Sequence, residues 1–192
     1  MLKNSSELNR IKEDKGYSAK LLSILKSGKI DFHISQSLYL YRIKFILDKY
    51  KKKKCERKST IFDSNNIKEQ QNFEEIIPKI FKMFDIDGQI VILSLFLLEK
   101  AIFKSKIFLD KINLIKFVVI SLVETIKFNN DEPDTGGKLI CSILRIDNDT
   151  LINLELKFLG VIDYKLNPDE DKYFAYKQKI LVLWIDYLKS LL

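Results

Sequence analysis

Few side chains in this 192-residue chain are placed for catalysis. The single histidine, His33, stands between Phe32 and Ile34, a setting that indicates a packing role and not a general base or a zinc ligand. The chain also has no glycine-rich loop of the kind that cradles phosphates. We therefore expect no enzyme, no cofactor and no small-molecule substrate.

Acidic residues gather at two places, in Asp131, Glu132 and Asp134 and again in Asp85 and Asp87. Neither group is followed by the distal bidentate glutamate that completes a calcium loop. Both are expected to be solvated turns, so we predict no metal site.

The two cysteines, Cys55 and Cys141, are too few for a disulfide framework and favour a reducing compartment. The N-terminus is polar and lacks the apolar core of a signal peptide. The longest uncharged apolar run, Ile90 to Leu98, is too short to cross a bilayer. These features predict an intracellular protein of the cytoplasm, the nucleus or both, without a membrane association.

The formal net charge of +7 would suit an acidic partner or a nucleic acid. The positive charge is carried mostly by lysine, because the only arginines are Arg10, Arg42, Arg57 and Arg145. Arginine usually makes the bidentate contacts to phosphates and bases. We therefore do not expect nucleic acid to be the main partner.

Apolar residues recur at helical spacing along the chain, and the six glycines and three prolines are few. The pattern predicts an all-α protein. The segment at 88–104 is apolar on all sides and is expected at the centre of a bundle, and Asp147 is a suitable N-cap for the segment that follows it. Pro78 is expected to start the regular part of its helix or to kink it. The expected helices cover residues 17–28, 35–51, 72–84, 88–104, 110–128, 138–145, 148–162 and 170–191.

Two charged residues stand on apolar helices where neither suggests catalysis. Lys127 lies at the end of the predicted helix 110–128, and Glu155 lies inside the predicted helix 148–162. They suit two polar anchors on a docking surface, although a solvated lysine and a surface glutamate would give the same pattern. Glu124 stands one turn before Lys127 and could pair with it.

Several short motifs between residues 70 and 176 follow one another in a recognisable order. Ser94–Lys100 (SLFLLEK) is an apolar helix that ends in an acidic–basic pair, and Ile126-Lys127-Phe128 precedes an acidic, asparagine-containing loop. Leu154–Leu159 (LELKFL) and Ile162–Leu166 (IDYKL) follow. In this order the motifs resemble the cyclin box, most closely the box of the P/U-type cyclins, which include the fungal phosphate-signalling cyclins.

The resemblance implies a regulatory subunit of a cyclin-dependent protein kinase. In that family a lysine at the end of the third box helix and a glutamate in the fifth bond to backbone groups beside the movable αC helix of the kinase. The corresponding residues here are Lys127 and Glu155. Phe128, Tyr164 and Leu166 would pack on the same kinase helix. One departure is that Leu144-Arg145 stand where P/U-type cyclins usually have two glycines.

The predicted organisation is a single cyclin box of five helices at 71–168. An N-terminal helical extension with a polar linker at 1–70 precedes the box, and a C-terminal helix at 169–192 follows it. The alternative is a cyclin-box-like helical scaffold, or a transcription-factor-type box, that contacts nucleic acid or other proteins.

Overall fold

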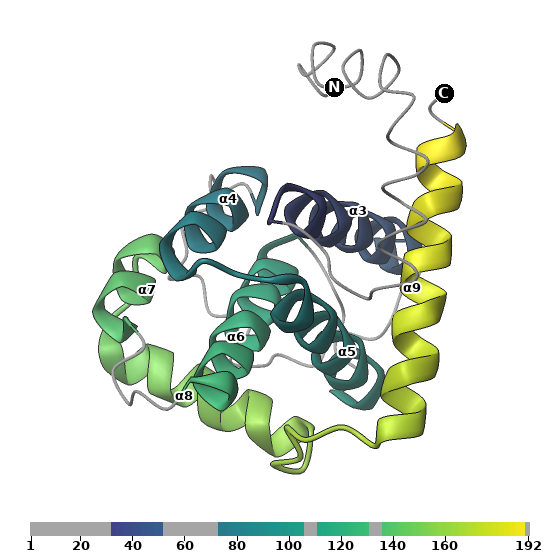
Figure 1. The fold of residues 1–192 in the computed structure, drawn as a ribbon. Coiled ribbons are helices and arrows are strands. Elements are labelled where there is room, and N and C mark those ends of the chain that lie inside the picture. The colour runs from purple at the N-terminus through teal and green to yellow at the C-terminus, as the bar shows by residue number, and fades with distance from the viewer. Residues whose placement is uncertain (1–31, 52–72, 106–110, 131–135, 191–192) are drawn as a thin grey trace.

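A computed structural model describes residues 32–51, 73–105, 111–130 and 136–190. In this part of the chain every regular element is a helix, so the all-α prediction is confirmed (Figure 1). The predicted helix at 17–28 and the polar linker up to residue 70 lie outside the described residues, as do Asp131, Glu132, Asp134 and Cys55. The helices are α3 (Phe32–Lys51), α4 (Phe73–Phe84), α5 (Gly88–Ser105), α6 (Lys111–Asn129), α7 (Gly137–Leu144), α8 (Asn148–Val161) and α9 (Glu170–Ser190).

The central element is α6, which packs against α3, α4, α5 and α8. Every residue of α6 from Leu114 to Ile126 is buried. The sequence favoured α5 for this place because α5 has the more apolar sequence. Most of α5 is indeed buried, but Phe103 near its end is 82% exposed. The polar residues of α6, such as Lys116 and Glu124, are buried because helices surround it on several sides.

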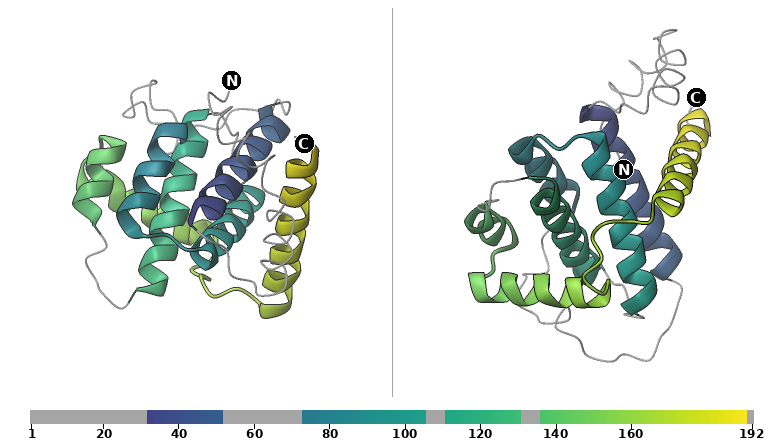
Figure 2. Two further views of the ribbon diagram at one scale, coloured as in Figure 1. Left: turned by 45° about the horizontal axis from the view of Figure 1, so that its top comes forward. Right: turned by 60° about the horizontal axis from the view of Figure 1, so that its bottom comes forward.

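Around α6, the other helices form a bundle in which α8 crosses the ends of α5 and α6, and α9 runs beside α3 and α5 (Figure 2). Pro78 lies inside α4, so the proline does not end that helix. Its ring removes one backbone donor from the helix. The apolar residues Ile77, Ile80 and Phe81 of α4 are fully buried.

Helix α3 belongs to the same hydrophobic core. Leu38, Tyr39 and Ile43 are fully buried. The Tyr39 hydroxyl lies 2.9 Å from the Ser94 hydroxyl, which lies 3.2 Å from the Ser121 hydroxyl. This chain of hydroxyls connects α3, α5 and α6, and each of its three hydroxyls has a partner. Phe45 on the same helix is 41% exposed, and Arg42 lies over its ring. The apolar residues of α3 surround much of the helix, so periodicity did not select the buried face.

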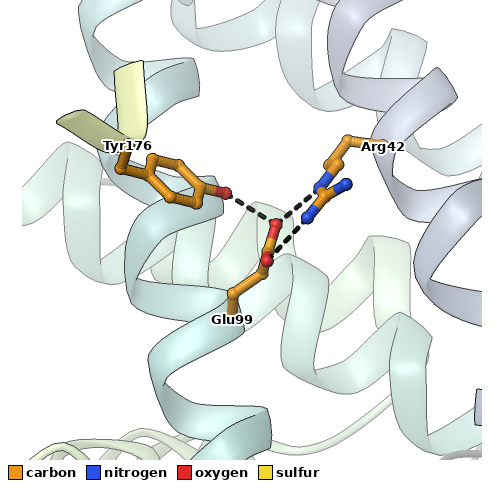
Figure 3. Close-up of polar contacts among 3 residues, drawn as sticks. All are labelled: Arg42, Glu99 and Tyr176. Carbon is orange, nitrogen blue, oxygen red and sulfur yellow. Dashed lines mark hydrogen bonds and ion pairs between the residues drawn. The ribbon is translucent and has the colours of Figure 1, made fainter. Parts of the chain in front are cut away.

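A second polar connection holds two outer helices, α3 and α9, to α5 (Figure 3). Glu99 on α5 accepts two hydrogen bonds from the Arg42 guanidinium, at 2.6 and 2.8 Å, and a third from the Tyr176 hydroxyl at 2.7 Å. Arg42 comes from α3 and Tyr176 from α9, and Arg42 is only 6% exposed. Buried charges of this kind are tolerated where they are fully paired.

The corner between α4 and α5 and the corner between α7 and α8 have the same three-residue design. Asp85 and Arg145 adopt left-handed backbone conformations with φ of 46° and 54°. The next residue, Ile86 or Ile146, donates its N–H to the carbonyl five residues earlier, closing the helix end. Arg145 thus holds the left-handed conformation at a position where glycine was expected from the resemblance.

An aspartate completes each of these corners. Asp87 caps α5 by accepting bonds from the backbone N–H groups of Gln89 and Ile90, both at 2.9 Å. Asp147 accepts a bond of 2.7 Å from the N–H of Thr150, so the predicted N-cap is confirmed. These caps satisfy backbone donors that the first helical turn leaves unpaired.

Candidate functional site

The structure brings Lys127 and Glu155 together. The Lys127 ammonium donates to Glu155 Oε1 at 2.7 Å and so connects the end of α6 to the middle of α8. The Lys127 side chain is 36% exposed and the Glu155 side chain 13% exposed. The pair therefore lies at the surface of the bundle, with its carboxylate partly sheltered.

Local sequence determines both positions. The Asp147 cap fixes the residue at which α8 begins. Leu151, Leu154 and Phe158 of this helix are buried in the core, so Glu155 lies beside the buried face. Lys127 follows immediately after the last buried residue of α6, Ile126. A lysine in the last turn also interacts favourably with the negative end of the helix dipole.

Glu124 is the third member of this group and was the alternative partner considered for Lys127. The ammonium pairs with Glu155, and no ion pair or hydrogen bond joins Glu124 to another described residue. Glu124 is only 4% exposed. Its burial, and then the negative charge of Glu155, raise its pKa from 4.5 to about 7, although the charge of Lys127 acts in the opposite direction.

The ion pair keeps unused hydrogen-bonding capacity. One of the three ammonium N–H groups of Lys127 is used within the described residues, and Oε2 of Glu155 accepts no bond from them. The pair can therefore donate to a carbonyl and accept from an N–H without separating. A peptide backbone presents those two groups side by side.

The three other predicted contact residues are placed differently from one another. Phe128 is 46% exposed, directly after Lys127. Tyr164 is 66% exposed, in the turn after α8. Leu166 is partly buried and packs against the core. Phe128 and Tyr164 are thus accessible side chains, whereas Leu166 also has a packing role.

Tyr164 differs from its counterparts at the other helix ends. Helix α8 closes with two left-handed residues, Asp163 and Tyr164 itself, with φ of 57° and 56°, and the Tyr164 N–H bonds to the Leu159 carbonyl at 2.8 Å. The equivalent residues after α4 and α7 are Ile86, which is fully buried, and Ile146, which packs against the core. After α8 the corresponding side chain points away from the core.

Two further apolar residues beside Glu155 were missed by sequence reasoning. Ile152 and Leu156 on α8 are 44% and 50% exposed. They are four residues apart and so lie on one face of the helix, which Glu155 borders. Their spacing was visible in the sequence, but apolar spacing of this kind normally predicts a buried face.

Among the described residues, no group of three or more histidine, cysteine, aspartate and glutamate side chains is arranged to hold a metal ion. In the same part of the chain, no helix is both long and apolar enough to span a membrane.

Comparison with known proteins gives no match to any family model, to any curated protein or to any solved structure.

Proposed function

We propose that this chain is a cyclin-like regulatory subunit that binds the catalytic chain of a cyclin-dependent protein kinase and stabilises its active state. The proposal has two supports. One is the resemblance of the ordered sequence motifs to the P/U-type cyclin box, for which α4 to α8 would be the five box helices. The other is the Lys127–Glu155 pair at the surface of α6 and α8.

The ion pair is the observation that carries the proposal. A lysine and a glutamate held by two packed helices form a preorganised donor and acceptor, so little side-chain freedom is lost when they bind a backbone segment. The exposed Phe128, Ile152, Leu156 and Tyr164 provide apolar area on the elements that hold the pair. Anchoring charges that fix the register, together with apolar contacts that supply most of the affinity, are typical of protein interfaces.

The proposed action on the kinase is a population shift. A protein kinase is active when a glutamate on its αC helix pairs with a lysine on its β3 strand. A partner that binds only the form with αC turned inward increases the population of that form. No residue of this chain needs to take part in the chemistry, in agreement with the expectation that it is not an enzyme.

Affinity purification of the tagged full chain tests the proposal. We expect a kinase catalytic chain to co-purify and to be identified by mass spectrometry. Glu155→Ala and Lys127→Glu should each weaken kinase binding by a factor of about 30 or more, because losing a charged anchor that the interface buries costs about 2–5 kcal/mol.

The control variants are Glu170→Ala and Lys179→Glu, which change the same residue types at exposed positions on α9. They should bind the kinase as the wild type does. The proposal is wrong if no kinase is recovered, or if the α6 and α8 variants retain it as fully as the α9 variants.

A further inference from the structure

A second surface lies where the end of α5 meets the turn after α8. The Lys104 ammonium forms an ion pair with the Asp163 carboxylate, and the Lys100 ammonium donates to the Lys165 carbonyl at 3.1 Å. Phe103 lies on α5 between the two lysines in sequence, and Tyr164 lies in the turn between their two partners. Phe103 and Tyr164 therefore lie on the two segments that these contacts join. The α5–turn surface consists of Lys100, Phe103, Lys104, Asp163, Tyr164, Lys165 and Lys172.

The aromatic residues of this surface are unusually open to solvent. Phe103 is 82% exposed, the largest value among the exposed large apolar residues described, on a helix whose other apolar residues are buried or partly buried. Tyr164 is 66% exposed at a position where the other two corners turn an isoleucine toward the core. Exposed aromatic residues at one junction are typical of a binding hot spot.

Lysines give the surface a positive charge. Burial, and then the nearby positive charges of Lys104, Lys165 and Lys172, lower the pKa of Lys100, although the negative charge of Asp163 acts in the opposite direction. Asp163 is paired with Lys104, and Asp169 lies 3.5 Å from Lys172. Glu170 and Asp171 follow Asp169 at the start of α9, so the positive charge comes from Lys100 and Lys165, which form no ion pair within the described residues. A partner carboxylate that faces these two lysines is electrostatically favoured.

We propose that the α5–turn surface binds an acidic segment of a partner protein, with a bulky apolar side chain of the segment against Phe103 and Tyr164 and its carboxylates facing the lysines. A nucleic acid fits less well, because the surface contains no arginine and its lysines alternate with aspartates. The proposal goes beyond kinase binding: of its residues, only Tyr164 is shared with the candidate kinase contacts.

A library of random 12-residue peptides displayed on phage, selected on the immobilised full chain, tests this proposal without assuming a motif. We expect the enriched peptides to combine several aspartates or glutamates with a bulky apolar residue. Their affinities are then measured by fluorescence anisotropy. Phe103→Ala and the double variant Lys100→Glu/Lys165→Glu should each weaken binding at least tenfold.

The matched controls are Leu139→Ala and Lys138→Glu, which remove an exposed apolar residue and an exposed lysine on α7. They should change peptide affinity by less than twofold. Lys127→Glu and Glu155→Ala should also leave it within twofold, so that this surface and the kinase-binding proposal fail or succeed separately.

Three outcomes would overturn the proposal. The enriched peptides could lack acidic residues, or they could bind the Phe103 and lysine variants as tightly as the wild type. Alternatively, a 20-nucleotide single-stranded DNA could bind more tightly than the best peptide and lose affinity in the lysine variant but not in Phe103→Ala. The last outcome would assign the surface to nucleic acid.

Discussion

At the scale of single residues, Glu124 determines the electrostatics around Lys127 and Glu155. Two carboxyl groups share one ammonium, and only Glu155 is bonded to it. When Glu124 is neutral, the Lys127–Glu155 pair is balanced. When Glu124 ionises, a second negative charge has to be accommodated with only 4% of the residue exposed.

The first prediction concerns this carboxyl group. The pKa of Glu124 is raised to about 7 in the folded chain from an ordinary value of 4.5. Between these two values the folded state binds more protons than the unfolded state, so stability falls as pH rises through this window. This loss of folding stability is complete above about pH 7 and absent below about pH 4.5. Glu124→Gln should therefore stabilise the fold more at pH 8 than at pH 5, by roughly 2 kcal/mol.

Urea denaturation followed by circular dichroism at the two pH values measures this difference. Glu75→Gln changes an exposed glutamate of α4 and serves as the control, with an expected effect below about 0.5 kcal/mol. If the benefit of Glu124→Gln is the same at pH 5 and pH 8, the carboxyl group does not titrate as described.

At the scale of elements, the helix ends explain how a chain with six glycines makes sharp corners. Asp85, Arg145 and Asp163 take left-handed conformations at the ends of α4, α7 and α8. Aspartate tolerates this conformation better than most residues, but arginine has no such advantage. Arg145, like Tyr164 with its φ of 56°, is therefore a place where the local sequence and its conformation disagree.

A second prediction follows from that disagreement. Arg145→Gly should raise the free energy of unfolding by about 0.5–1 kcal/mol, because the relief of left-handed strain exceeds the entropy that glycine gains in the unfolded chain. Arg145→Ala removes the same exposed side chain without relieving the strain and should have little effect. Thermal or urea denaturation of both variants decides the matter: a glycine variant less stable than the alanine variant would contradict the prediction.

At the scale of the whole molecule, the Arg42–Glu99–Tyr176 group joins helices from distant parts of the sequence (Figure 3). It lies beside aromatic contacts, in which Phe96 meets Tyr173 and Tyr176 edge to face. Glu99 belongs to the acidic–basic pair that ends the SLFLLEK motif, and the neighbouring Lys100 bonds to the turn after α8. This pair thus orients the outer elements relative to the core.

The third prediction is that Glu99→Ala lowers the free energy of unfolding by about 3–5 kcal/mol, because it leaves the Arg42 guanidinium buried and unpaired. Arg42→Met with Glu99→Leu should recover much of the loss, since no uncompensated charge remains. Lys44→Ala breaks an exposed ion pair between α3 and α4 and is the control, with an expected cost of less than about 1 kcal/mol. Equal losses in Glu99→Ala and Lys44→Ala would show that the buried group does not hold the outer helices.

Much of the secondary structure was predictable from the sequence because its signals are local. Helical spacing predicted helices at 72–84 and 148–162, and the structure has them at Phe73–Phe84 and Asn148–Val161. Asp147 lies next to the turn that it caps. Such signals act over a few residues and do not depend on the packing of distant helices.

The sequence by itself determined the all-α class and the approximate positions of the helices, and it identified the charged residues Lys127 and Glu155 as candidate binding residues. Only the tertiary structure decided that α6 is the most enclosed helix, that Lys127 pairs with Glu155 and not with Glu124, and that Phe103 remains exposed. The physical reason is that burial and partner choice depend on which helices pack together. Packing brings together residues that are far apart in the chain, and the spacing of residues along one helix does not specify which helices will be its neighbours.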